Sequence, residues 1–201
     1  MRDQTEDLFR IDQGGRISYE SSEERDVLFF DLETQKSFAE VGGRGKISEL
    51  GMSVGVTLNE DSGEAKVYLE NDVDDLIRDL GDARMVIGFN IVNFDFEVLK
   101  RYTDFNPKSI PALDMLAVIY AKLGFRISLD GLAEETLGLS KSGDGLDAVL
   151  WYREGQWDRL IDYCRRDVEI TRSLYNFAKT RGYLVYHDRK TKGKRRIEID
   201  W

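Results

Sequence analysis

The stretch VLFFDLET, from Val27 to Thr34, decides how this sequence is interpreted. Its apolar run ends at Asp31, a pattern that predicts a short buried β-strand. Side chains two residues apart share one face of a strand, so Asp31 and Glu33 are expected to point to the same spot. Two carboxylates at the edge of a core repel each other unless a cation lies between them. The stretch therefore favours a metal site over two strand-end residues that make only local hydrogen bonds.

The segments that follow this strand predict an α/β fold. Two further strands, at residues 51–58 and 65–69, are joined by short turns, which favours an antiparallel meander. The pattern then alternates between helix and strand, which favours parallel strands in a mixed sheet flanked by helices. The later elements are predicted as a strand at 85–89 and helices at 72–80, 94–102, 115–123, 128–137 and 156–180.

The chain is predicted to have three parts. Residues 1–25 form a polar leader, and residues 26–180 form the main domain. Residues 181–201 are predicted as a C-terminal hairpin appendage, with strands at 183–186 and 197–199 that flank the basic turn RKTKGKRR. That turn is interpreted as a solvated hairpin tip, with an arm that contacts phosphates as the alternative.

Composition excludes several classes of protein. The 201 residues suffice for one domain with a sizeable core. No apolar run approaches the roughly 20 residues that cross a bilayer, and the N-terminus lacks a signal-peptide core, so we expect a cytoplasmic protein with no membrane partner. Cys164 is the only cysteine and His187 the only histidine, which excludes a disulfide and a Cys/His zinc cluster. The net charge of −9 by itself argues mildly against a nucleic-acid partner.

A second carboxylate stands in the segment GFNIVNFD, residues 88–95. A predicted strand runs into a glycine-containing loop, and Asp95 opens the next helix. An aspartate at a helix start that only complements the helix dipole is the structural alternative. Asn90 and the flanking Phe89 and Phe94 add polar and stacking groups beside it.

The third segment is DYCRRD, residues 162–167, on the longest predicted helix. Tyr163 and Asp167 are four residues apart and share a helix face. A strand, a loop–helix junction and a late helix together bring four carboxylates and a phenol into reach of one point. Magnesium prefers such oxygen ligands, and two ions roughly 3.5–4 Å apart would activate a water and stabilise a leaving oxygen.

With FFDLET, GFNIVNFD and YCRRD in this order, residues 27–179 resemble the DEDD superfamily of 3′–5′ exonucleases. The chain looks closest to its tyrosine subgroup, because Asp162 stands where the other subgroup has histidine. The segment SLDGLAEETLGL is also similar to this superfamily. The first two motifs are similar to the proofreading domains of family B polymerases. The whole chain resembles predicted exonuclease domains that occur alone or beside helicases in prokaryotes.

This resemblance implies a ribonuclease-H-like fold that carries a metal site. Two divalent cations, Mg²⁺ or Mn²⁺, would be held by Asp31, Glu33, Asp95 and Asp167, and Tyr163 would orient a water. Further expected contacts with the substrate are Leu32, Thr34, Asn90 and Phe94.

The function implied is metal-dependent hydrolysis of DNA or RNA from the 3′ end, preferring single strands, with release of nucleoside 5′-monophosphates. Two alternatives stay open: a nucleic-acid-binding module without chemistry that serves a helicase or repair partner, and an endonuclease specific for flaps or loops. The sequence leaves open DNA against RNA, magnesium against manganese, and the oligomeric state.

The remaining segments favour ordinary structural interpretations. The loop at 42–46 is not a Walker A motif, since Glu40 stands where that motif requires glycine and Ile47 where it requires serine or threonine. Arg44 and Lys46 are expected in an exposed, flexible loop, with substrate contact as the alternative. Asp114 is expected to cap a helix. Turn residues are expected at Asp144 and Asp147, and packing is preferred over base stacking for Tyr102, Phe105, Trp151 and Trp157.

Overall fold

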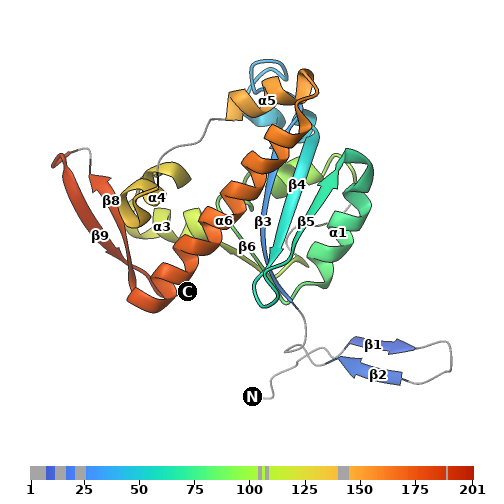
Figure 1. The fold of residues 1–201 in the computed structure, drawn as a ribbon, viewed down its shortest axis with the longest axis horizontal. Coiled ribbons are helices and arrows are strands. Elements are labelled where there is room, and N and C mark those ends of the chain that lie inside the picture. The colour runs from blue at the N-terminus through green and yellow to red at the C-terminus, as the bar shows by residue number, and fades with distance from the viewer. Residues whose placement is uncertain are drawn as a thin grey trace.

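The computed structural model describes residues 8–11, 17–20, 26–103, 106, 109–139, 145–188 and 190–201. A five-stranded sheet in the order β5-β4-β3-β6-β7 forms the centre of the molecule (Figure 1). The strands of this sheet are β3 (Val27–Thr34), β4 (Met52–Asn59), β5 (Ala65–Leu69), β6 (Met85–Gly88) and β7 (Ala112–Asp114). The helices are α1 (Val73–Asp82), α2 (Asp95–Leu99), α3 (Met115–Leu123), α4 (Leu129–Leu137), α5 (Gly145–Arg153) and α6 (Trp157–Arg181), with 3₁₀ segments at η2 (Arg44–Leu50) and η3 (Glu70–Asp72).

The sheet is mixed, as predicted. β3 pairs antiparallel with β4, and β4 pairs antiparallel with β5, so the first three strands form the expected meander. On its other side β3 pairs parallel with β6, which pairs parallel with β7. The strand that carries Asp31 and Glu33 is therefore the central strand of the sheet.

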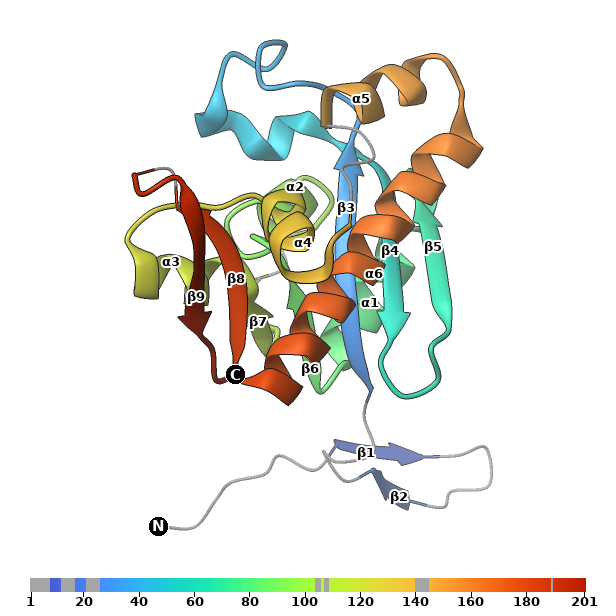
Figure 2. The ribbon, with the colours of Figure 1, turned by 60° about the vertical axis from the view of Figure 1, so that its left-hand side comes forward.

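Two hydrophobic cores lie on the two faces of this sheet. One contains Leu28, Phe30 and Leu32 of β3 together with buried residues of α1 and α2. The other contains Phe29 of β3 and buried residues of α3, α4, α5 and α6. This assignment follows directly from the alternation of side chains along a strand. Figure 2 shows α6 running across the sheet in front of β3.

The long helix α6 ends where the sequence predicts. Its buried residues recur at helical spacing: Leu160, Cys164, Val168, Ile170, Thr171, Leu174 and Ala178. Gly182 ends the helix in the left-handed conformation, with φ of 78°, which glycine adopts at little cost. No helix in the described part of the chain combines the length and apolar character of a membrane span.

Two elements near the site were not predicted. Helix α5 occupies a segment interpreted as turn, so the expectation of a turn at Asp147 is wrong, because Asp147 lies in the first turn of this helix. Asp144 lies outside the described residues. The loop at 35–50 contains the 3₁₀ segment η2, whose Leu50 is buried.

The two ends of the chain each form a hairpin. Strands β1 (Leu8–Ile11) and β2 (Ile17–Glu20) pair antiparallel within the leader, where no element was predicted. Strands β8 (Tyr183–Asp188) and β9 (Gly193–Glu198) form the predicted C-terminal hairpin. This hairpin is more than an appendage, because its buried apolar residues belong to the same core as α6: Leu184, Tyr186, Ile197 and Ile199.

Candidate active site

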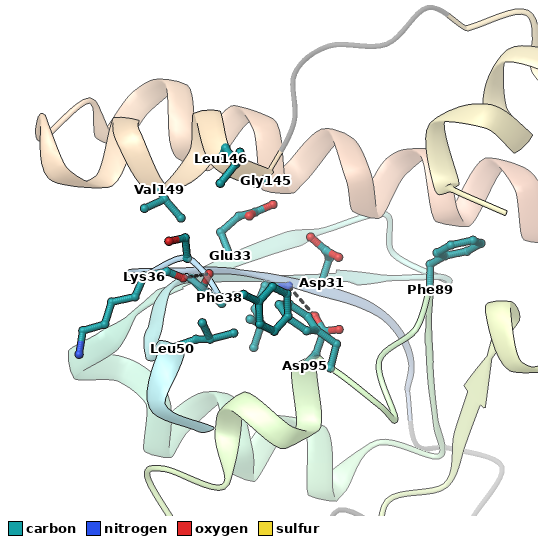
Figure 3. Close-up of a pocket in the computed structure, with 14 residues that line it drawn as sticks. Asp31, Glu33, Lys36, Phe38, Leu50, Phe89, Asp95, Gly145, Leu146 and Val149 are labelled. Atoms are coloured by element: carbon teal, nitrogen blue, oxygen red, sulfur yellow. Dashed lines mark hydrogen bonds between the residues drawn. The ribbon is translucent and has the colours of Figure 1, made fainter. Parts of the chain in front are cut away.

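Asp31 and Glu33 lie on the face of β3 that is turned toward α6. Phe29, two residues before Asp31, is fully buried in the core beneath that helix. The period of two along a strand places Asp31 and Glu33 in the same row as Phe29. Figure 3 shows both carboxylates on one side of the strand, facing the helices above it. The predicted sharing of a face by these two residues is therefore confirmed.

Helix α6 brings Asp167 to the same point. Ligand atoms of Asp31, Glu33 and Asp167 all lie within 4.8 Å of one another. The helix can approach this closely because the residue that meets the strand is a small one. Cys164 is fully buried, and its Sγ donates to the backbone oxygen of Asp31 at 3.4 Å. Cys164 is therefore a small buried residue at the contact between α6 and β3.

Asp95 reaches β3 from the other side of the sheet. Its Oδ1 accepts a hydrogen bond from the backbone N–H of Leu32 at 3.0 Å, which is drawn in Figure 3. β6 pairs with β3 only as far as Phe29, so this part of the strand edge is open to a side chain. Asp95 is buried, with 2% of its surface exposed, and it is not part of the three-residue cluster within 4.8 Å.

Gly88 makes this approach possible. A Cβ atom at this position would lie 2.2 Å from Cγ2 of Ile91 and 2.8 Å from the backbone oxygen of Phe30. Both distances are shorter than van der Waals contact allows. Only glycine therefore lets the chain after β6 turn tightly against β3 and present Asp95 to Leu32.

Burial and mutual repulsion raise the pKa of all four carboxyl groups. Burial raises the pKa of Asp95 and of Asp167 to about 7, and the charges of Asp114 and Asp130, respectively, add to the effect. The pKa values of Asp31 and Glu33 lie well above the usual range, first through burial and then through the neighbouring carboxylates. At neutral pH such a group of acids is therefore either partly protonated or held together by compensating positive charge.

The donor set fits a divalent metal ion. All the converging groups are carboxylate oxygens, the ligands that Mg²⁺ and Mn²⁺ prefer. Among the residues that the structure describes, none of the four carboxylates takes part in a salt bridge. The predicted cofactor therefore suits the residues that converge here.

Tyr163 lies one helical turn before Asp167 and shares its face. A hydrogen bond between the two side chains lowers the pKa of Asp167, while burial and the nearby carboxylates raise the pKa of Tyr163 above its usual value. The ring of Trp151, on α5, packs edge-on against the Tyr163 ring with centroids 5.6 Å apart. The phenol is thus fixed in place, and its hydroxyl stays protonated at neutral pH.

Asp130, in the first turn of α4, is a residue that the sequence analysis missed. Its charge raises the pKa of both Asp167 and Tyr163, so it lies near the cluster. Asp130 belongs to the segment SLDGLAEETLGL, which was noted only as a resemblance. The only signal in the sequence was that Asp130 stands in this segment. The segment by itself did not indicate that Asp130 lies near the other carboxylates.

A cleft of about 380 Å³ opens beside the carboxylates (Figure 3). Three residues expected to contact substrate line this cleft: Leu32, Thr34 and Phe94. The ring of Phe94 lies 6.0 Å from that of Phe38, at a tilt of 59°. The remaining lining residues are Asp31, Glu33, Lys36, Ser37, Phe38, Leu50, Phe89, Asp95, Gly145, Leu146 and Val149.

Asn90 is the expected contact that does not line this cleft. Its backbone adopts the left-handed conformation, with φ of 73°, and its Oδ1 accepts a hydrogen bond from Nη2 of Arg126 at 2.8 Å. Asp114 fixes the same loop by accepting from the backbone N–H groups of Asn90 and Val92 at 2.9 and 3.1 Å. Asp114 also accepts from Ala117, which confirms the predicted helix cap.

The other weighed residues have structural partners. The Arg44 guanidinium lies over the Phe38 ring at 4.8 Å, and Lys46 pairs with Glu49. The Tyr102 hydroxyl accepts from the backbone N–H of Met52 and donates to a carboxylate, so its interpretation as a packing residue is confirmed.

The two tryptophans also pack as preferred. Trp157 meets Tyr152 edge-on, and Trp151 meets Tyr163 as described above. Phe105 lies outside the described residues.

Comparisons with known proteins agree with this geometry. A sequence profile described as the RNase_H superfamily matches residues 28–179, a span that contains all five predicted catalytic positions. The structure is similar to the crystal structure of Trypanosoma brucei RNase D, with a TM-score of 0.55 and 15% sequence identity. The similar region covers 78% of this chain and 58% of that one, so the chain spans little more than half of its length. No curated protein matches the sequence.

Proposed function

The chain belongs to the ribonuclease H superfamily, and from that premise we propose that it is a metal-dependent 3′–5′ exonuclease. It hydrolyses phosphodiester bonds of DNA or RNA and prefers single strands. Water adds to the terminal phosphorus, and the bond to the preceding 3′ oxygen breaks. The products are a nucleoside 5′-monophosphate and a strand one nucleotide shorter.

One observation carries this proposal. Three partly buried carboxylates from β3 and α6 hold their oxygens within 4.8 Å of one another. Such an arrangement is unfavourable for folding alone, because buried like charges repel. It favours binding of cations, and the neighbouring cleft leaves room for a phosphodiester.

Asp31, Glu33 and Asp167 would hold the metal ions, with Asp95 as the fourth carboxylate. Two bound divalent ions, Mg²⁺ or Mn²⁺, supply Lewis-acid chemistry that activates water and stabilises the leaving oxygen. The hydrogen bond from the Leu32 N–H supports this role for Asp95. It occupies one carboxylate oxygen, so the other oxygen is available to a metal ion. This arrangement would keep the carboxylate aligned with Asp31 across the strand.

Tyr163 would orient the attacking water. Its raised pKa keeps the hydroxyl protonated, so the phenol acts through a hydrogen bond and not as the base that removes the water's proton. Packing against Trp151 supports this role, because a ring held on two sides points its hydroxyl in a fixed direction.

The shape of the cleft favours action at a strand end. Phe38 and Phe94 offer aromatic rings to a terminal base, and Leu146 and Val149 of α5 line the cleft beside the loop that carries Phe38. An ion pair between Arg153 and Glu40 ties the end of α5 to the same loop. The two walls of the cleft are thus joined. A cleft with joined walls accommodates a free 3′ end more readily than the middle of a continuous strand.

A gel assay tests the proposal. A 5′-labelled single-stranded DNA and a matching RNA are incubated with the protein and Mg²⁺, Mn²⁺ or EDTA, and the products are separated on a denaturing gel. We expect a ladder that shortens from the 3′ end with metal and is absent with EDTA. Internal cuts would favour the endonuclease alternative. Binding without any cleavage would favour a non-catalytic module that serves a helicase or repair partner.

A further inference from the structure

The C-terminal hairpin is a segment of net positive charge in an acidic chain. Residues 183–201, here called the basic hairpin, contain six Lys or Arg residues and three Asp or Glu residues, a net charge of +3. The whole chain carries −9, so the remaining residues carry −12. An acidic protein with an acidic catalytic site repels a phosphate backbone, and the basic hairpin is the segment that opposes this repulsion.

Several of these cations are not neutralised within the molecule. Lys194 pairs with Glu135 and Arg195 pairs with Asp188, each at 2.9 Å. Lys190 and Lys192 are exposed at the tip and take part in no salt bridge among the described residues. Arg196 lies with its guanidinium 4.2 Å from the centroid of the Tyr183 ring. The tip therefore presents free positive charge to solvent.

The hairpin holds these cations on a rigid base. Its Leu184 is fully buried, and Tyr186 and Ile197 are nearly so, all in the core shared with α6. Thr136 of α4 accepts a hydrogen bond from the N–H of Val185 and donates one to its carbonyl oxygen, at 3.0 and 2.9 Å. The hairpin that carries these cations therefore keeps a constant position relative to α4.

Helix α4 connects the basic hairpin to the catalytic carboxylates. Its first turn carries Asp130, which acts on Asp167 and Tyr163, while Glu135 and Thr136 further along contact the hairpin. Figures 1 and 2 both show α4 between the hairpin and β3. At 1.5 Å per residue the helix is about 13 Å long, roughly the span of four stacked nucleotides at 3.4 Å each.

From these observations we infer that the basic hairpin binds the phosphates of the substrate strand about four or more nucleotides upstream of the 3′ end held in the cleft. This inference rests on the proposed function for the identity of the strand. A role limited to protecting the edge strand β9 from aggregation would also use lysines and arginines. The two roles differ in the dependence of activity on substrate length.

The experiment compares two variants with equal changes of charge. Lys190→Glu/Lys192→Glu reverses the charge of the hairpin tip. As a control, Arg78→Glu/Arg84→Glu reverses the charge of two exposed residues, one on α1 and one at the start of β6. The value of kcat/KM is measured for oligonucleotides of about 3 and about 12 nucleotides, and binding of the longer one is measured in EDTA by fluorescence anisotropy. Melting temperatures check that both variants fold.

We expect the tip variant to lose roughly tenfold or more in kcat/KM and in affinity for the longer strand, while the short strand is cut within about twofold of wild type. The slope of log affinity against log salt should fall by about 1.4, since each lost single-strand phosphate contact removes about 0.7. The control variant should lose much less, and Lys190→Arg/Lys192→Arg should retain the wild-type values.

Failure of the inference is distinguishable from failure of the proposed function. If wild type cuts both strands and the two reversed variants behave alike, the inference is wrong and the exonuclease stands. If wild type cuts neither strand, the exonuclease proposal fails, and the binding measurement still decides the inference. Equal affinity of wild type and tip variant for the longer strand would then overturn it.

Discussion

The two faces of β3 show opposite uses of the same strand. On one face, Leu28, Phe30 and Leu32 are apolar and buried along the whole strand, with 9%, 0% and 3% of their surface exposed. On the other face, Phe29 is followed by Asp31 and Glu33. The pairing of β3 with β4 is regular from Leu28 to Glu33, with a register shift only between Glu33 and Thr34, so the difference over this stretch lies in the side chains.

Within the eight residues of β3, one face therefore serves the stability of the fold and the other serves the proposed chemistry. The apolar face removes hydrocarbon from water, which stabilises the fold. The acidic face gathers like charges in a poorly hydrated place, which destabilises it until a cation binds. A substitution on one face should therefore change the free energy of unfolding and leave catalysis intact, whereas one on the other face should do the reverse.

The largest effect is expected on the acidic face. Asp31→Asn keeps the shape of the side chain and removes a charge that the proposed metal ions need. We therefore expect kcat/KM to fall roughly a thousandfold or more, which corresponds to a loss of several kcal/mol of transition-state stabilisation. The measurement is the rate of release of nucleoside 5′-monophosphate with saturating Mg²⁺. Retained activity would show that this cluster is not the catalytic site.

The same variant has a distinguishing effect on stability. Without metal, Asn relieves repulsion from Asp95, Glu33 and Asp167, so its melting temperature in EDTA should be equal to or above that of wild type. Added Mn²⁺ should raise the melting temperature of the wild type more than that of the variant. A clear loss of stability in EDTA would mean that Asp31 is mainly a structural residue.

The apolar face should give the second-largest effect. Phe30→Ala deletes a fully buried ring that stacks on Phe96 at 6.3 Å, and the expected loss is about 3–5 kcal/mol of unfolding free energy. Urea denaturation measures this loss. Below the melting temperature, kcat/KM should stay within a few-fold of wild type. A large fall in activity of the folded variant would mean that the two faces of β3 are coupled.

Local periodicity predicted which of these side chains share a face, and the family resemblance implied that they act together at one metal site. Asp31 and Glu33 follow from a period of two, and Tyr163 and Asp167 follow from a spacing of four, because both elements are regular where the acids stand. The mixed sheet followed in the same way from strand lengths and short turns. Contacts within one element can be inferred without knowing the partner of that element.

Contacts between distant segments were not predicted from the sequence. The Asn90 loop is held by Asp114 and Arg126, which lie 24 and 36 residues away, and the substrate contact expected of Asn90 stays a prediction. Asp130 was missed for the same reason. Helix α5 was missed because Gly145 and Asp147 at its start resemble a turn, and its helical form is supported by burial of Ala148 in the core with α6.

The third effect concerns the pH dependence of stability on the acidic face. The pKa values of Asp95 and Asp167 are about 7 in the folded protein, against a usual value of 3.8. The folded state therefore binds these protons more tightly than the unfolded state does. Their contribution to stability is fully present below about pH 4 and is lost as the pH rises through 7. In EDTA, we expect the melting temperature to fall by several degrees between pH 5 and about 8.

Metal and a matched variant sharpen this test. Mg²⁺ or Mn²⁺ binds the ionised carboxylates, so a saturating concentration should flatten or reverse the pH dependence. Asp95→Asn/Asp167→Asn removes these two titrating groups and should reduce the pH dependence in EDTA, leaving the part that comes from Asp31 and Glu33, whose pKa values are also raised. An unchanged fall in this variant would assign the pH dependence to groups other than Asp95 and Asp167.

The smallest effect is expected at Tyr163, which in the proposed mechanism acts on the water through a single hydrogen bond. Tyr163→Phe removes the hydroxyl and keeps the ring that packs on Trp151, so we expect kcat to fall about tenfold with KM unchanged. The pH–rate profile should keep its shape, because the raised pKa keeps the hydroxyl protonated throughout the working range.

Tyr175→Phe supplies a matched control on the same helix. The Tyr175 ring stacks on Trp201 and meets Phe29 edge-on, away from the carboxylates, so loss of its hydroxyl should leave kcat unchanged. If Tyr163→Phe instead costs roughly a thousandfold and abolishes the alkaline part of the profile, the phenol is the base and not an orienting donor. If both variants match wild type, a residue other than Tyr163 orients the water, and the acidic face of β3 acts with Asp95 and Asp167 without help from the phenol.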